Sequence, residues 1–207
     1  MFLMNDISKL TLSDEEQQLV NNSDWILTKH VIIDKVYHLF GNLAATMKTT
    51  IDEGNHQLPK EVVQSTAKIS KGENYLKLPY VMLDYPRCFD GRNIFAVRTM
   101  FWWGNFFSMT LQLSGVFKKM FAEHICNNQA MLAKNDFFLC VNEDEWQHDF
   151  EENNYRAVKQ FEKKEFGRVI REKKFIKLSI KFALNEWKNM PGLLERSFTG
   201  MMELMKT

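Results

Sequence analysis

The stretch FAVRTMFWWGNFFS, residues 95–108, constrains the fold more than any other part of this sequence. It is almost wholly apolar, but it contains one arginine, Arg98, and the dipeptide Gly104-Asn105 interrupts it. A Gly-X dipeptide between apolar runs is typical of a two-residue type II′ turn, because glycine takes the positive φ that the first turn position needs. The sequence therefore predicts a β-hairpin whose tip lies at Gly104-Asn105.

A two-residue turn at this tip would fix which side chains share a face of the hairpin. Trp103 would lie opposite Phe106, and Arg98 would lie opposite Leu111. The face that carries Arg98 would then be almost entirely apolar and would hold Ile94, Ala96, Met100, Trp102, Phe107, Met109, Leu111 and Leu113. Because an unpaired charge is costly to bury, we expect Arg98 to have a partner there.

Helical signals dominate the first third of the chain. A capping box, SDEE at residues 13–16, predicts a short helix that ends near Asn21. A second start at residues 23–24 predicts a long helix up to Gly54, where glycine suits the helix end. Pro59 then fits the first turn of a third, shorter helix.

Strand signals dominate the remainder. The run YVMLDY at 80–85 predicts a strand beside the hairpin, and DFFLCVN at 136–142 predicts a short apolar strand. In FIKLSIKFAL at 175–184, apolar residues alternate with Lys177, Ser179 and Lys181, which predicts a half-buried strand with its lysines in water, where they would protect a sheet edge.

These elements predict an α+β fold in which a mainly antiparallel sheet of about four or five strands packs against helices. We expect one α+β domain over residues 1–207, with a helical region at 1–72 and a sheet-containing region at 75–207. A chain of 207 residues with 45% hydrophobic composition is long enough to bury one core of this kind.

Composition disfavours several classes of function. Lys plus Arg number 27 and Asp plus Glu number 26, so the net charge of +1 gives no general attraction for phosphate backbones or anionic membranes. The 3 cysteines lack CxxC spacing, and no signal peptide or membrane-spanning run is recognisable. We therefore expect a soluble cytoplasmic protein that has no cofactor or metal and binds neither nucleic acid nor membranes.

The basic segment 156–181 is compatible with that expectation. It is rich in Lys and Arg, but the stretch before it, residues 143–152, contains six acids and no Lys or Arg. We expect the two segments to neutralise each other within the molecule.

Arg98 carries the leading functional hypothesis, which is a non-catalytic protein that binds a small acidic or aromatic ligand beside the hairpin. The guanidinium would pair with the acidic group, Trp102 or Phe107 would stack on the ligand, and Met100 and Met109 would form the walls. The simpler interpretation is that Asp84, expected on the neighbouring strand, pairs with Arg98. Further cations in the adjoining connection, Arg87 and Arg92, would add to the mouth of the same pocket.

The alternative hypothesis is an interaction module or homodimer. It would use the outer face of the hairpin, where the two-residue turn places Phe101, Trp103 and Phe106 together. An unrecognised enzyme is the third hypothesis, although the sequence indicates no catalytic residue and contains no P-loop, GxGxxG, GxSxG or HExxH pattern.

Overall fold

The computed structural model describes residues 10–54 and 57–206. The helices in these ranges are α1 (Asp14–Asn21), α2 (Ser23–Glu53), α3 (Lys60–Val63), α4 (Gly115–Asn127), α5 (Gln129–Lys134), α6 (Lys163–Glu172) and α7 (Met190–Glu203), with short 3-10 helices at Val158–Gln160 and Leu184–Asn189. The strands are β1 (Lys68–Tyr75), β2 (Leu78–Asp90), β3 (Asn93–Trp102), β4 (Phe106–Ser114), β5 (Phe138–Cys140), β6 (Tyr155–Ala157) and β7 (Phe175–Ala183). The chain divides after His38 into two compact units.

The first unit contains α1 and the beginning of α2. The predicted capping box is confirmed, because the Ser13 hydroxyl accepts a hydrogen bond from the Glu16 amide at 3.2 Å while the Glu16 carboxylate accepts one from the Ser13 amide at 2.8 Å. The break between the two helices falls at Asn22, whose backbone is extended. The predicted starts and ends of both helices thus agree with the structure.

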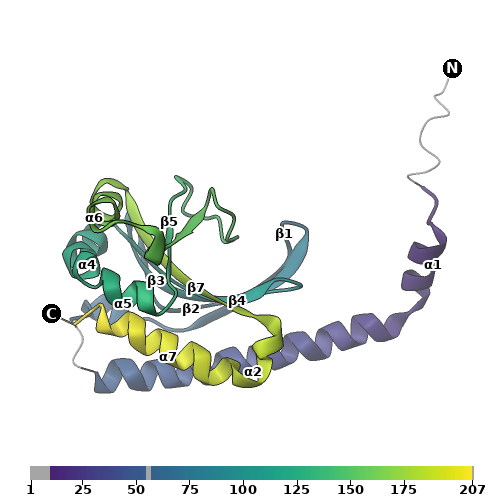
Figure 1. Cartoon of the computed structure of the whole chain (residues 1–207). Helices are drawn as coiled ribbons and strands as arrows, with labels where there is room; N and C mark the ends of the chain where they lie inside the picture. The colour runs from purple at the N-terminus through teal and green to yellow at the C-terminus, as the bar shows by residue number, and fades with distance from the viewer. Residues whose placement is uncertain (1–9, 55–56, 207) are drawn as a thin grey trace. The chain divides into compact units, whose positions relative to one another are not determined.

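The second unit is built on an antiparallel sheet, so the α+β class is confirmed (Figure 1). In the described part of the chain the sheet has seven strands in the order β1-β2-β3-β4-β7-β5-β6, rather than the four or five that we expected. One additional strand, β1, begins at Lys68, within the region expected to be helical. Another, β6, has only three residues.

One face of this sheet forms the apolar core of the second unit with the helices. The Phe95 ring meets Phe117 of α4 edge-on at 5.9 Å, and the Phe107 ring lies 5.3 Å from Trp187, which precedes α7. Phe40 in the later part of α2 also contacts Phe107, at 6.4 Å. We call this the helix-covered face.

The opposite face is polar where β4 meets β7. Thr110 and Ser179 are paired across these strands, and their hydroxyl oxygens lie 2.7 Å apart. Lys177 points to the same face and is 1% exposed, so our expectation that it lies in water was wrong, whereas Lys181 is exposed as expected. The expected edge position of this strand was also wrong, because β7 lies between β4 and β5.

The register of the hairpin differs from the prediction by one residue. Three residues, rather than two, connect β3 to β4, and Gly104 takes a φ of 71° in the middle of this loop. Trp102 therefore lies opposite Phe106, and Arg98 lies opposite Thr110 instead of Leu111. Since neighbouring residues of a strand point to opposite faces, this shift reverses the side chains of β4 relative to those of β3. Phe107 and Met109 lie in the core as expected, but Arg98, Met100 and Trp102 do not share their face.

The register places Phe107 in the core, and this can be tested by truncation. We expect Phe107→Ala to lower the free energy of unfolding by about 3–5 kcal/mol, because the change removes a fully buried ring and leaves a cavity. Phe89→Ala is the control, since Phe89 is 41% exposed, and it should cost less than about 1 kcal/mol. Chemical denaturation measures both, and equal losses would contradict the burial of Phe107 on the helix-covered face.

Candidate functional site

Arg98 forms the expected ion pair with Asp84, its direct cross-strand neighbour on β2. The pair is a two-pronged fork, because Nε donates to Oδ1 at 2.7 Å and Nη2 donates to Oδ2 at 3.1 Å. Only 12% of the Arg98 side chain and 13% of the Asp84 side chain are exposed. The guanidinium edge that would recognise an acidic ligand is therefore already occupied by a carboxylate of the protein.

His148 provides a further partner for Arg98, since its Nε2 lies 3.3 Å from Nη1. Burial, together with the charges of Lys177 and Arg98, lowers the pKa of His148 well below its usual value. The imidazole is therefore neutral at pH 7, so its Nε2 can accept a hydrogen bond from Arg98. The backbone on this side is held by Tyr75, whose hydroxyl oxygen accepts from the His148 amide at 2.6 Å and from the Asp149 amide at 3.1 Å.

The other residues of the predicted ligand site lie on two different faces of the sheet. Met100 and Trp102 share the face of Arg98 and Asp84, where the Trp102 ring meets Tyr75 at 5.2 Å and Phe106 at 5.3 Å. Phe107 and Met109 lie on the helix-covered face, so their placement beside Arg98 was wrong. The cause is the three-residue loop, which reverses the side-chain direction of β4 relative to β3.

The predicted interface residues are also separated. Phe101 is buried on the helix-covered face, where its ring lies 5.9 Å from Trp187. Trp103 lies in the connecting loop, and Phe106 faces the opposite side, with its ring 5.1 Å from Phe150. The single aromatic face that we predicted from Phe101, Trp103 and Phe106 is therefore not formed.

The polar face of the sheet is covered by the connection between β5 and β6, residues 141–154, which we call the acidic loop. Lys177 donates to the backbone oxygens of Glu145, at 3.0 Å, and of Gln147, and burial lowers the pKa of Lys177 to about 8. Gln112 donates to the Glu145 carboxylate at 2.8 Å. Lys173 forms an ion pair with Glu143 at 2.8 Å, so the expected neutralisation of the acidic stretch by the basic one is confirmed at this position.

A cavity of about 670 Å³ lies at the open end of the hairpin, opposite its tip. It is lined by Gly91, Arg92, Ile94, Ser114, Gly115, Glu145, Lys174 and Phe175, and we call it the Arg92 cavity. The Arg92 and Lys174 side chains are exposed, and within the described residues neither forms an ion pair. Arg87, by contrast, donates from Nε to the Thr66 carbonyl at 3.1 Å and does not line this cavity.

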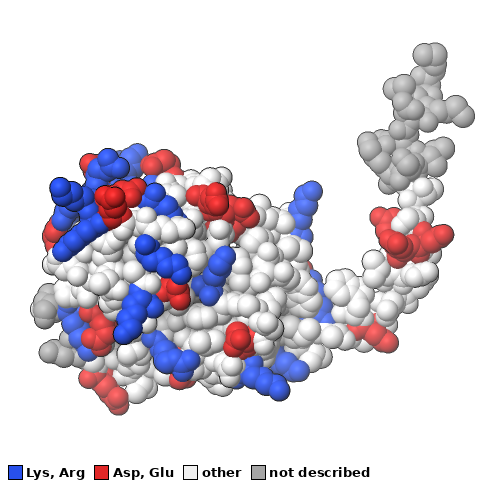
Figure 2. Space-filling view, in the orientation of Figure 1, with Lys and Arg blue, Asp and Glu red and all other residues white. Residues whose placement is uncertain are grey.

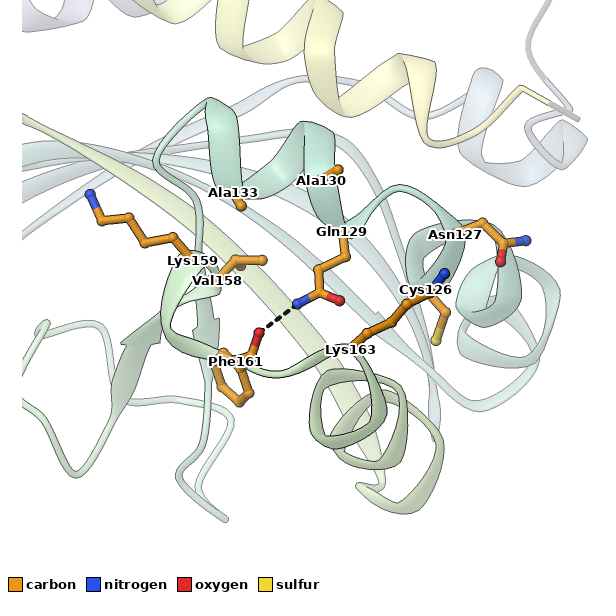
Figure 3. Close-up of a pocket in the computed structure, with 9 residues that line it drawn as sticks. All are labelled: Cys126, Asn127, Gln129, Ala130, Ala133, Val158, Lys159, Phe161 and Lys163. Carbon is orange, nitrogen blue, oxygen red and sulfur yellow. Dashed lines mark hydrogen bonds between the residues drawn. The ribbon is translucent and has the colours of Figure 1, made fainter.

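A smaller cavity, of about 330 Å³, lies between α4, α5 and the segment that leads into α6 (Figure 3). Two of its polar side chains, Gln129 and Lys159, already have partners. Gln129 donates to the Phe161 carbonyl at 2.9 Å, and Lys159 pairs with Asp136 at 2.9 Å. Cys126 also lines it, and burial raises the pKa of this thiol, which disfavours a reactive thiolate.

Comparisons with known proteins add no family. No protein-family model matches this chain, and neither a curated protein nor a solved structure gives a significant match. Among the described residues, no group of three or more His, Cys, Asp or Glu side chains could hold a metal ion. No helix in the same ranges has the length and apolar character needed to cross a bilayer.

The Arg98–Asp84 pair is expected to stabilise the fold. Asp84→Leu should lower the free energy of unfolding by about 3–5 kcal/mol, because it leaves a buried guanidinium without its carboxylate. Adding Arg98→Met should recover much of this loss, since the uncompensated charge is then removed. Equilibrium unfolding of the two variants measures both effects.

Glu123→Leu is the matched control for this measurement. Glu123 forms the same fork with Arg171, at 2.8 and 3.0 Å, but the side chains are 68% and 55% exposed. An exposed pair contributes about 1 kcal/mol or less. A loss of this small size in Asp84→Leu would contradict a stabilising role for the buried pair.

The acidic loop should depend on Lys177 for its attachment to the sheet. We expect Lys177→Met to accelerate amide exchange of residues 145–149 by about tenfold or more, because two hydrogen bonds from a charged donor are lost. Hydrogen exchange followed by mass spectrometry measures this, with Lys188→Met at an exposed position as the control. Unchanged exchange in Lys177→Met would show that the loop is held by other contacts.

Proposed function

We propose that this chain binds a small ligand with one anionic group and an apolar body in the Arg92 cavity. The observation that carries the proposal is the presence of two unpaired cationic side chains, Arg92 and Lys174, on the wall of a cavity of about 670 Å³. Small-molecule sites commonly have volumes of about 300–1,000 Å³ and contain a few polar groups that fix the orientation of the ligand.

The apolar residues in the wall of the cavity favour a ligand that is partly apolar. Ile94 is 6% exposed and Phe175 is 5% exposed, so both are held firmly by the sheet. The Ser114 hydroxyl is already engaged, because it donates to the Arg92 carbonyl at 2.6 Å and accepts from the Ile94 amide at 3.1 Å. These two bonds fix the backbone of Arg92 while leaving its guanidinium available for a ligand.

The carboxylate of Glu145 favours a ligand with a single anionic group over a polyanion. This carboxylate lies on the same wall and accepts a hydrogen bond from Gln112 at 2.8 Å. A polyphosphate would bring several negative charges close to this carboxylate, and like charges repel strongly where the surroundings are partly buried. A carboxylate or a single phosphate group can instead contact the two cations and direct its apolar part toward Phe175.

This proposal keeps the ligand class expected from the sequence but moves the site. The earlier hypothesis placed the ligand at Arg98, whose fork is occupied by Asp84. The Arg92 cavity lies at the open end of the same hairpin, where neither Arg92 nor Lys174 forms an ion pair within the described residues. Arg92 therefore takes the role that was first assigned to Arg98.

Thermal shift with a panel of small carboxylates and phosphate monoesters, with and without aromatic groups, tests the proposal. A ligand present at about one hundred times its dissociation constant should raise the melting temperature by about 5–10 °C for a chain of this size. Arg92→Ala and Lys174→Ala should each weaken binding by about tenfold to a hundredfold, because each removes a charge-assisted contact.

Arg168→Ala is the control, since Arg168 is an exposed arginine of α6 and does not line the cavity. Its binding should equal that of the unmodified chain. A panel without any thermal shift, or a shift that persists in both Arg92→Ala and Lys174→Ala, would rule out the proposed site.

A further inference from the structure

The first unit exposes many large apolar side chains over a short stretch of chain. No residue of α1 is buried. Close to the break between the helices, Val20 is 69% exposed and Leu27 is 59% exposed. The other members of this surface are Leu10, Leu12, Leu19, Trp25, Ile26 and Val31. Apolar side chains gathered in this way mark an interaction surface, whereas singly scattered ones need no explanation.

Several of these side chains form a groove at the junction of α1 and α2. The groove has a volume of about 470 Å³ and is lined by Leu19, Val20, Asn22, Ser23, Trp25, Ile26 and Leu27. All of these residues belong to the first unit. A mainly apolar lining favours the side chains of a protein partner over a charged small molecule.

The charges on either side of the groove are complementary to those of a second copy of the chain. Residues 10–28 contain four acids and no Lys or Arg, and Figure 2 shows the acidic cluster on α1. Residues 29–38 contain two lysines and two histidines against one aspartate. Two copies in antiparallel orientation bring the acidic half of each beside the basic half of the other, whereas a parallel pair brings like charges together.

We propose that this chain forms a homodimer in which the first units of two copies pair antiparallel, about a two-fold axis at the α1–α2 junction. Residues 19–20 of one copy then pack on residues 26–27 of the other, because the two segments lie at similar distances on either side of the junction. Glu15 and Glu16 come opposite His30 and its neighbours in the same way. A two-fold arrangement closes on itself, so each groove is filled once and no filament forms.

The first unit sets an upper limit on the size of this interface. A standard interface takes about 20–30 residues from each partner, and the segment 10–38 offers fewer than its full length, because Ile33 and Val36 are buried within the chain itself. The inference is separate from the proposed ligand site, because the Arg92 cavity is lined only by residues of the second unit.

Sedimentation equilibrium of the full chain tests the dimer. The expected mass is twice the 24.5 kDa of one chain. Leu27→Glu puts a charge into the apolar groove and should raise the dissociation constant by at least about thirtyfold. The change Glu15→Lys should also weaken the dimer, because it reverses a charge that selects the antiparallel orientation and leaves the capping box of Ser13 and Glu16 intact.

Met120→Glu is the control, since Met120 is 54% exposed on α4 in the second unit, and it should leave the dissociation constant unchanged. Circular dichroism verifies that each variant is folded. A chain that is monomeric at about 100 µM, a dimer that survives Leu27→Glu, or a dimer that Met120→Glu dissociates would each overturn the inference.

Cysteine cross-linking tests the orientation, in a Cys88→Ser background because Cys88 is partly exposed. Asn22→Cys lies near the proposed axis, so two copies should form a disulfide with each other under mild oxidation. Leu10→Cys lies far from the axis and should not. Cross-linking at both positions would indicate a parallel pair, and cross-linking at neither would place the contact elsewhere; both results overturn the antiparallel dimer.

Discussion

The pairing of β3 with β4 is the constraint on which the rest of the second unit depends. Three residues separate Trp102 from Phe106, so Arg98 lies opposite Thr110. In this register Phe95, Phe101 and Phe107 lie together on the helix-covered face. The polar side chains of β4 gather on the other face with Arg98, beside Met100 and Trp102. A slip of one residue would exchange the two sets of β4 side chains. The three-residue loop between β3 and β4 therefore determines both the apolar core and the polar face of the sheet.

The buried cations on the polar face of the sheet limit the kind of segment that can pack against it. Arg98 and Lys177 are largely withdrawn from water, and the apolar stripe of a helix would leave Lys177 without acceptors and Arg98 with Asp84 alone. An irregular connection can instead offer backbone carbonyls and side-chain acceptors, and residues 141–154 do so through Glu145, Gln147 and His148. Since a covalent connection keeps these acceptors close to the sheet, both buried cations find hydrogen-bond acceptors within the molecule.

The sequence predicted those features that depend on neighbouring residues. The capping box, the position of the hairpin and the pairing of Asp84 with Arg98 all follow from local patterns or adjacent strands. The register was not predictable in the same way, because a glycine with positive φ suits both a two-residue and a three-residue loop. Alternation in β7 likewise showed that Lys177 and Ile176 point to opposite faces, but it could not show that the lysine face is covered.

The candidate sites depended on relations that the sequence does not contain. The Arg92 cavity exists only because the strand order brings separate segments together, namely those that carry Arg92 and Ile94, Ser114, Glu145, and Lys174 and Phe175. We predicted Arg98 as a ligand contact because it is a charged residue among apolar ones. A charge in such a position can be buried only if it has a partner within the protein. Once that partner is found, the charge is less available for a ligand. Binding is therefore better sought at charges and apolar surfaces that the fold leaves unpaired than at those it had to bury.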